Sequence, residues 1–192
     1  LSSLEAWAAK IAYIHDGQNK RDTVKLIRIL RAQGHEVTVI STPPAANVLT
    51  GDQYAAQGYQ LVIVDENISS GNVGNKLRNS PVPVITWEGF LYSGNRSAFN
   101  ADSGLTGGTY SSAADAAAVN GGAGADFGQV VRETAIEIVN PSHPLAAGLP
   151  AGLVQVFDPA HISPDPGEGN GVITFVGNRT LIPGAVAVAT VP

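Results

Sequence analysis

Three side chains able to do acid–base chemistry lie at the ends of strand-like segments. His15, Glu66 and Glu88 each follow a run of apolar, mostly β-branched residues, and Asp65 precedes Glu66. An imidazole near carboxylates can form a general acid/base pair or hold a divalent cation. The same carboxylates can instead cap helix N-termini, with His15 filling a polar crevice. No H-E-x-x-H or similar metal-ligand spacing occurs, so both interpretations stay open.

Three further residues are candidates for ligand binding. Asp16 follows His15, Trp87 precedes Glu88, and His143 lies between Ser142 and Pro144. His143 in that setting also suits a hydrogen bond within its own turn. The segment after His15 lacks the G-x-G-x-x-G pattern, so phosphate binding there is only weakly indicated.

A polar loop near the C-terminus offers oxygen ligands for calcium, namely Asp165, Glu168 and Asn170. Their spacing is not that of an EF-hand, and a solvated turn is the favoured explanation. No other cofactor is indicated. Three N-glycosylation sequons, which often occur by chance, begin at Asn67, Asn95 and Asn178.

The candidate residues require a sheet that brings strand ends together. Uninterrupted apolar runs are typical of strands covered on both faces, and short crossovers between them predict parallel pairing. A helix after Asn19, ended by Gly34, and a short helix over 51–58 separate the first three strands. The pattern predicts an α/β fold with a doubly wound, flavodoxin-like, mostly parallel sheet and helices on both faces. The expected strands are 11–14, 35–40, 61–64 and 84–87. Ile63 and Ile85 are expected to be fully buried in adjacent central strands.

The second half of the chain departs from this pattern. Residues 93–127 are rich in Gly, Ala, Ser, Asn and Asp, and we expect an insertion loop with one or two helical turns at Ala113–Val119. Further strands are expected at 134–139, 153–157, 172–176 and 185–191. Residues 1–9 form an N-terminal extension, and residues 10–192 form a single domain.

Composition excludes several functional classes. The chain has 192 residues, no cysteine and a net charge of −5, so thiolate chemistry and Cys-ligated zinc are excluded and a nucleic-acid surface is not indicated. No apolar run is long enough to span a bilayer. Low lysine content and polar, Gly-rich loops favour an extracellular or cell-surface location.

Three segments together resemble a known family. They are Ser70–Arg78, Val82–Glu88 and the sequence HPLAAGL, which begins at His143. They are similar to secreted domains of the class I glutamine amidotransferase-like fold related to the trehalose-utilisation (ThuA-like) proteins, whose H-P-x-x-x-G-L signature the last segment matches. Amidotransferases carry a catalytic Cys at the position of Trp87-Glu88-Gly89, where this chain has none. Because no G-x-S-x-G elbow replaces it, glutaminase and cysteine-peptidase chemistry are excluded.

Two functions remain from different classes. The first is a non-enzymatic extracellular domain for surface structure or self-assembly, with carbohydrate contact possible. The second is a ThuA-like enzyme that acts on a sugar or polyol through His15, Glu66 and Glu88, and a small-ligand sensor at the same crevice lies between the two. Residues 93–127 offer little apolar surface to offset the backbone entropy lost on ordering. We therefore expect a homo-oligomer or filament whose interface includes Leu4, Trp7, Tyr110 and Phe127.

Overall fold

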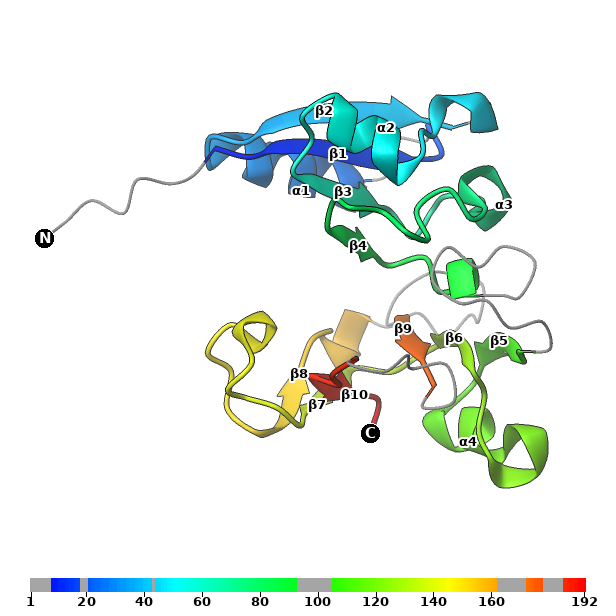
Figure 1. Ribbon diagram of the computed structural model, residues 1–192. Coiled ribbons are helices and arrows are strands. Elements are labelled where there is room, and N and C mark those ends of the chain that lie inside the picture. The colour runs from blue at the N-terminus through cyan, green and yellow to red at the C-terminus, as the bar shows by residue number, and fades with distance from the viewer. Residues whose placement is uncertain (1–7, 18–20, 43, 93–104, 162–171, 178–184) are drawn as a thin grey trace, which may run out of the picture. The chain divides into compact units, whose positions relative to one another are not determined.

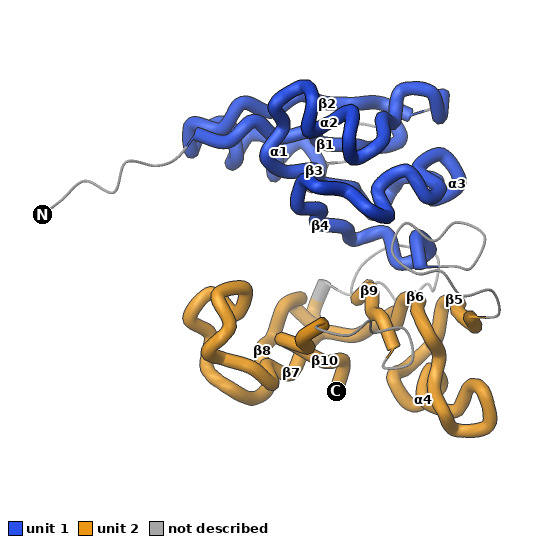
Figure 2. The backbone as a smooth tube through the Cα atoms, viewed as in Figure 1, with its two compact units in different colours: residues 1–101 blue, residues 102–192 orange. Residues whose placement is uncertain are grey.

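A computed structural model describes residues 8–17, 21–42, 44–92, 105–161, 172–177 and 185–192. The chain divides into two compact units, Leu1–Ala101 and Asp102–Pro192 (Figure 2).

Unit 1 is built on a parallel four-stranded sheet with the order β2-β1-β3-β4 (Figure 1). Neighbouring strands are in register through Tyr13, Ile63 and Ile85, which are successive partners across β1, β3 and β4. All four expected strands and their parallel pairing are confirmed. Their bounds are β1 Lys10–His15, β2 Glu36–Ser41, β3 Leu61–Val64 and β4 Val84–Thr86.

Local signals in the sequence account for the helices of unit 1. Helix α1 (Arg21–Ala32) ends where expected, because Gly34 has φ +90° and its N–H donates to the carbonyl of Arg31, while the N–H of His35 reaches Leu30. Helix α2 (Gly51–Ala56) begins with a capping box formed by Thr50 and Gln53. The remaining helices are α3 Ser70–Val73 and the 3₁₀ segments η1 Ala45–Asn47 and η2 Gly89–Tyr92.

Two apolar cores lie on opposite faces of this sheet. Alternate residues of a strand point to opposite faces. Ile11, Tyr13 and Ile63 pack against Ile27 of α1. The second core combines residues of the other parity with α2, α3 and the loop after α3: Ala12, Ile14, Val62, Val64, Tyr54, Val73 and Leu77.

The expectation that Ile85 is buried is wrong. Ile63 is 3 % exposed and Ile85 is 41 % exposed, although the two residues are register partners. Strand β4 is an edge strand of this sheet, and α1 covers the middle of the face on which Ile85 lies. Strand type and pairing were predictable from the local pattern, whereas the edge position was not.

Unit 2 contains two three-stranded sheets. One is antiparallel with the order β10-β7-β8, and the other has the order β5-β6-β9, with β5 parallel and β9 antiparallel to β6. The strands expected at 134–139, 153–157 and 172–176 are confirmed with small shifts, whereas only two residues of 185–191 are strand. The bounds are β5 Gly107–Tyr110, β6 Phe127–Val130, β7 Ala135–Ile138, β8 Gly152–Gln155, β9 Ile173–Val176 and β10 Ala189–Thr190. Two 3₁₀ segments complete the unit, η3 Pro144–Ala146 and η4 Pro159–His161.

The described part of 93–127 contains more regular structure than the insertion loop expected there. Strand β5 and helix α4 (Ala113–Gly122) lie there, and α4 includes the helical turns expected at 113–119. The small residues themselves permit the packing. A Cβ at Gly107 would lie 2.2 Å from the Phe127 ring, and a Cβ at Gly128 would lie 2.2 Å from the carbonyl oxygen of Gly108. Glycine thus permits close packing against an aromatic ring at one position and against the backbone at another, and Ala116 and Ala125 are core residues.

In the described ranges, none of the helices combines the length and the apolarity that crossing a membrane requires.

Ile63 and Ile85 form a matched pair for measuring burial. Ile63→Ala is expected to lower the free energy of unfolding of unit 1 by ~2–5 kcal/mol, because it removes packed atoms from the α1 core. Ile85→Ala is expected to cost less than ~1 kcal/mol, because that side chain keeps much of its contact with water. Urea unfolding followed by tryptophan fluorescence reports on unit 1, since both tryptophans lie in residues 1–101. Equal losses for the two variants would contradict the edge position of β4.

Candidate site at the carboxyl edge of the parallel sheet

Parallel strands bring their C-terminal ends to one edge, which is where open α/β sheets bind ligands. In unit 1 this edge carries His15 at the end of β1, Ser41 at the end of β2, and Asp65 and Glu66 directly after β3. Glu88 follows β4 by two residues. The candidate residues from the sequence therefore lie along the same edge.

The Asp65 carboxylate is the centre of this edge. It is 8 % exposed and accepts hydrogen bonds from Tyr13 Oη at 2.5 Å and from Thr23 Oγ1 at 2.8 Å. Its other oxygen accepts from the backbone N–H of Asn67 at 3.2 Å. One carboxylate thus connects β1, the first turns of α1 and the loop after β3.

Burial raises the pKa of the Tyr13 phenol well above its ordinary value of 10.0. The hydrogen bond to Asp65 and the negative charge of that carboxylate raise the pKa further, and the hydrogen bond with Thr23 opposes them weakly. Tyr13 therefore stays a neutral donor to Asp65 over the physiological range.

Asn67 extends the same network. Its Oδ1 accepts from the backbone N–H of Asp16 at 3.3 Å, and its Nδ2 donates to Thr23 Oγ1 at 3.4 Å. Asp16 is half-buried at this position. Because Nδ2 is the atom that glycosylation would modify, the Asn67 sequon is engaged in the fold rather than displayed.

His15 is buried, and its two ring nitrogens have different partners. Nδ1 accepts from the backbone N–H of Gly17 at 3.1 Å, and Nε2 lies 3.3 Å from Ser41 Oγ. A backbone N–H can only donate, so Nδ1 of the neutral ring carries no proton and Nε2 carries it. His15 then donates to Ser41 and does not accept the Ser41 proton. This tautomer positions the imidazole as a connector between β1 and β2 rather than as a base that activates Ser41.

Glu88 is buried at the start of the 3₁₀ segment η2, where its Oε1 accepts from the backbone N–H of Phe90 at 2.7 Å. This is the geometry of a carboxylate that caps a helical turn. Glu66 is exposed. Strand β3 separates β1 from β4, so His15 and Glu88 do not end neighbouring strands.

Within the described ranges, no group of three or more His, Cys, Asp or Glu side chains is arranged to hold a metal ion. His15, Glu66 and Glu88 are therefore not gathered into a metal centre there. The calcium candidates Asp165, Glu168 and Asn170 lie outside the described residues.

The other two ligand-binding candidates are Trp87 in unit 1 and His143 in unit 2. The backbone N–H of Trp87 donates to Val64, and its side chain is 40 % exposed. His143 lies in unit 2, where its Nδ1 accepts from the N–H of Leu145 at 3.2 Å and caps η3. The hydrogen bond that the sequence suggested for His143 within its own turn is thus present.

Two of the four interface candidates, Phe127 and Tyr110, are among the described residues. Phe127 is 4 % exposed in the chain and has almost no surface to offer a partner chain. Tyr110 is half-buried and packs against Phe175, with ring centroids 6.1 Å apart. The other two interface candidates, Leu4 and Trp7, lie outside the described residues. The glycosylation sequons at Asn95 and Asn178 also lie outside them.

The sequence alone did not indicate that Tyr13, Thr23 and Ser41 lie at the carboxyl edge of the sheet. Tyr13 has the same strand parity as His15, and Thr23 precedes Ile27 by one helical turn, so both signals were present in the pattern. It also did not find Asp126 in unit 2. This carboxylate is fully buried, and its Oδ2 accepts from the N–H of Thr106 at 2.8 Å at the start of β5.

No family model matches the chain, and no curated protein and no solved structure shows significant similarity to it. The likeness to amidotransferase-like domains therefore remains a prediction from the sequence.

The Tyr13–Asp65 contact predicts a pH dependence with a definite sign. The phenol pKa is higher in the folded state, so its contribution is complete below the ordinary tyrosine value of 10.0 and is lost as the pH rises above it. Tyr13→Phe is expected to lower the free energy of unfolding at neutral pH by ~1–3 kcal/mol, because Asp65 loses a donor. The variant should also show a shallower loss of stability at alkaline pH. Burial raises the pKa of Tyr54 and Tyr92 as well, so a residual slope is expected. Urea unfolding at neutral and alkaline pH measures both effects, and identical slopes would contradict the assignment.

Proposed function

We propose that this chain is a non-enzymatic domain that self-associates, as part of an extracellular or cell-surface structure. The observation that carries the proposal is the set of large apolar side chains on the surface of both units. In unit 2, Leu145 is 76 %, Leu153 is 70 % and Val186 is 58 % exposed. Unit 1 adds Ile29, Val39, Ile85 and Trp87, and unit 2 also adds Val139, Leu149, Val156 and Phe157.

Single exposed apolar residues are ordinary, but their concentration in unit 2 is informative. The sheet β10-β7-β8 has strands of only two to four residues, so each strand offers few side chains to a core. Full burial of a side chain such as Leu contributes ~1.5–3 kcal/mol relative to exposure. Burial against a second chain is a direct way to gain that free energy.

The carboxyl edge supports the same proposal. The Asp65 carboxylate, the His15 imidazole and the Glu88 carboxylate each bind groups of their own unit. These contacts orient a loop, a strand end and a short helix, so they support structural roles for the three side chains.

The fold proposal goes beyond the parallel sheet itself. We infer that unit 1 is the first half of a doubly wound, flavodoxin-like sheet of the amidotransferase-like class. The strand order β2-β1-β3-β4 and the helices packed on both faces support this inference.

A second candidate function is binding or turnover of a sugar or polyol at the carboxyl edge. It is favoured by Trp87, whose exposed ring just beyond the end of β4 offers an apolar face to a sugar. Titration with trehalose, followed by tryptophan fluorescence, tests it with Trp87→Phe as the control. A saturable change that the variant loses would favour this candidate, and no change in the wild-type chain would remove it.

Self-association is tested by particle mass. Sedimentation velocity over a range of concentrations is expected to show species larger than one chain that increase with concentration. If the N-terminal extension contributes to the interface, deletion of residues 1–8 is expected to lower the fraction of the larger species. A wild-type chain that stays monomeric at every concentration contradicts the proposed function. An unchanged oligomer after the deletion contradicts only the role of the extension.

A further inference from the structure

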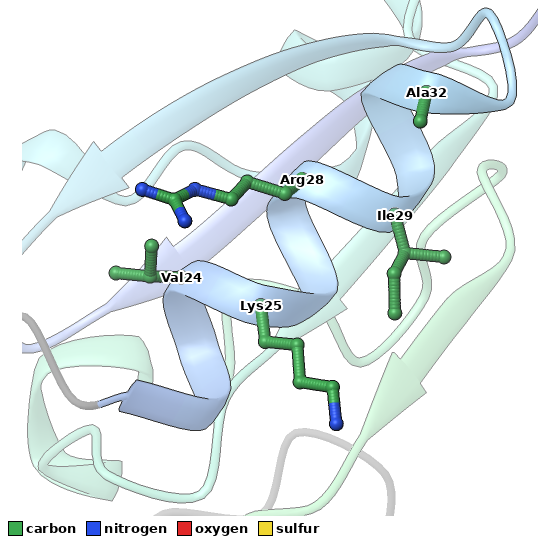
Figure 3. A pocket seen from close by; sticks show the side chains of 5 residues that line it. All are labelled: Val24, Lys25, Arg28, Ile29 and Ala32. Carbon is green, nitrogen blue, oxygen red and sulfur yellow. The ribbon is translucent and has the colours of Figure 1, made fainter.

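The outer face of α1 presents a shallow hollow with a mixed apolar and basic lining. It is lined by Val24, Lys25, Arg28, Ile29 and Ala32, shown as sticks in Figure 3. Ile29 is 45 % exposed, and Lys25 and Arg28 are also exposed. Lys25 and Arg28 make no ion pair or side-chain hydrogen bond with the described part of the chain.

The opposite face of α1 explains why these side chains point outward. Thr23 bonds Asp65, and Ile27 packs on the sheet. With 3.6 residues per turn, Lys25 and Ile29 then lie on the surface away from the sheet. They are four residues apart, which places their Cβ atoms ~5–6 Å from each other.

The outer face of the sheet β10-β7-β8 in unit 2 carries the complementary pair. Glu137 of β7 and Leu153 of β8 are direct antiparallel partners, so their side chains are on the same face. Directly opposed residues have Cβ atoms ~4.5–5.5 Å apart. Leu153 is 70 % exposed, and Glu137 is exposed and has no ion pair among the described residues.

The two surfaces have similar spacing between their aliphatic and charged side chains, and their charges are opposite. One offers an aliphatic side chain beside basic groups, and the other offers an aliphatic side chain beside a carboxylate at nearly the same separation. The charge of the two units is also uneven. Residues 1–101 contain nine basic and eight acidic residues, a net +1, whereas residues 102–192 contain two basic and eight acidic residues, a net −6.

We infer that the outer face of α1 in one chain binds the β7–β8 face of a second copy of this chain. Ile29 packs against Leu153, and Lys25 or Arg28 pairs with Glu137. The contact uses two different surfaces, so it is head-to-tail and leaves one free surface at each end of a pair. Further copies can therefore add at both ends. The inference rests on the proposed self-association and names the surfaces that produce it.

Two neutral variants test the inference without creating new attractive pairs. The first combines Lys25→Gln with Arg28→Gln, which removes the basic groups and keeps good helix formers. The second combines Glu137→Gln with Leu153→Thr, which removes the carboxylate and the exposed aliphatic chain from a strand surface. Lys25→Arg combined with Arg28→Lys keeps the charge and serves as the matched control. Circular dichroism checks that every variant keeps the wild-type fold.

The decisive experiment is to mix the two variants. Each variant alone is expected to show a dissociation constant at least about tenfold higher than that of the wild type. At concentrations between the dissociation constant of the wild type and those of the variants, an equimolar mixture is expected to form particles of two chains and no larger. The second variant still has its α1 face and the first still has its β7–β8 face, so one junction can form. The charge-preserving control is expected to associate as the wild type does, and added salt is expected to weaken the wild-type association.

The outcomes separate this inference from the proposed function. If the wild type associates and either variant alone associates equally well, the proposed function stands and these surfaces are wrong. If both variants are monomeric and their mixture is also monomeric, the pairing between copies is overturned. A monomeric wild type overturns the proposed function and the inference together.

Discussion

The buried carboxylate of Asp65 is the interaction on which the arrangement of unit 1 depends. A buried carboxylate without donors is costly, so its partners must be held in position. Tyr13 from β1 and Thr23 from α1 supply two of the donors, and the backbone of Asn67 supplies a third. These contacts set the rotation of α1 about its axis. That rotation directs Ile27 toward the sheet and leaves Lys25 and Ile29 on the surface.

Unit 2 is organised by a different constraint, namely the closeness of backbone to backbone. Gly107 and Gly128 lie where any side chain would collide with a ring or a carbonyl, and the small residues Ala116 and Ala125 form the core with Val130. Such packing orders a Gly- and Ala-rich chain that has few large apolar residues. Leu145 of η3 and Leu153 of β8 lie outside this core and are exposed. The proposed self-association would use these exposed side chains.

The local pattern of the sequence was sufficient to predict the strands and helices of unit 1 but not which elements lie next to one another. The run Leu61–Val64 and the glycine at 34 predicted a strand and a helix end that the structure contains. Ile63 and Ile85 have the same local pattern, yet their exposure differs because strand order is a non-local property. The segment 105–127 was expected to be mostly loop, and it contains β5 and α4. Hydrophobic periodicity gives no signal for packing by glycine and alanine. At the carboxyl edge, His15, Asp65 and Glu88 were predictable from strand ends. The faces of Tyr13 and Thr23 could be read from local spacing, but their contacts with Asp65, and the contact of Ser41 with His15, depended on strand register and helix rotation.

The most direct test of the proposed contact is carbodiimide cross-linking of an equimolar mixture of isotopically heavy and light chains. This reagent joins an amine to a carboxylate that touches it, so mass spectrometry of the cross-linked peptides identifies the pair and its origin. The proposed contact predicts a Lys25–Glu137 cross-link in which one peptide is heavy and the other is light. A Lys25–Glu137 cross-link found only between peptides of the same isotope, or its absence from samples that contain oligomers, would contradict it.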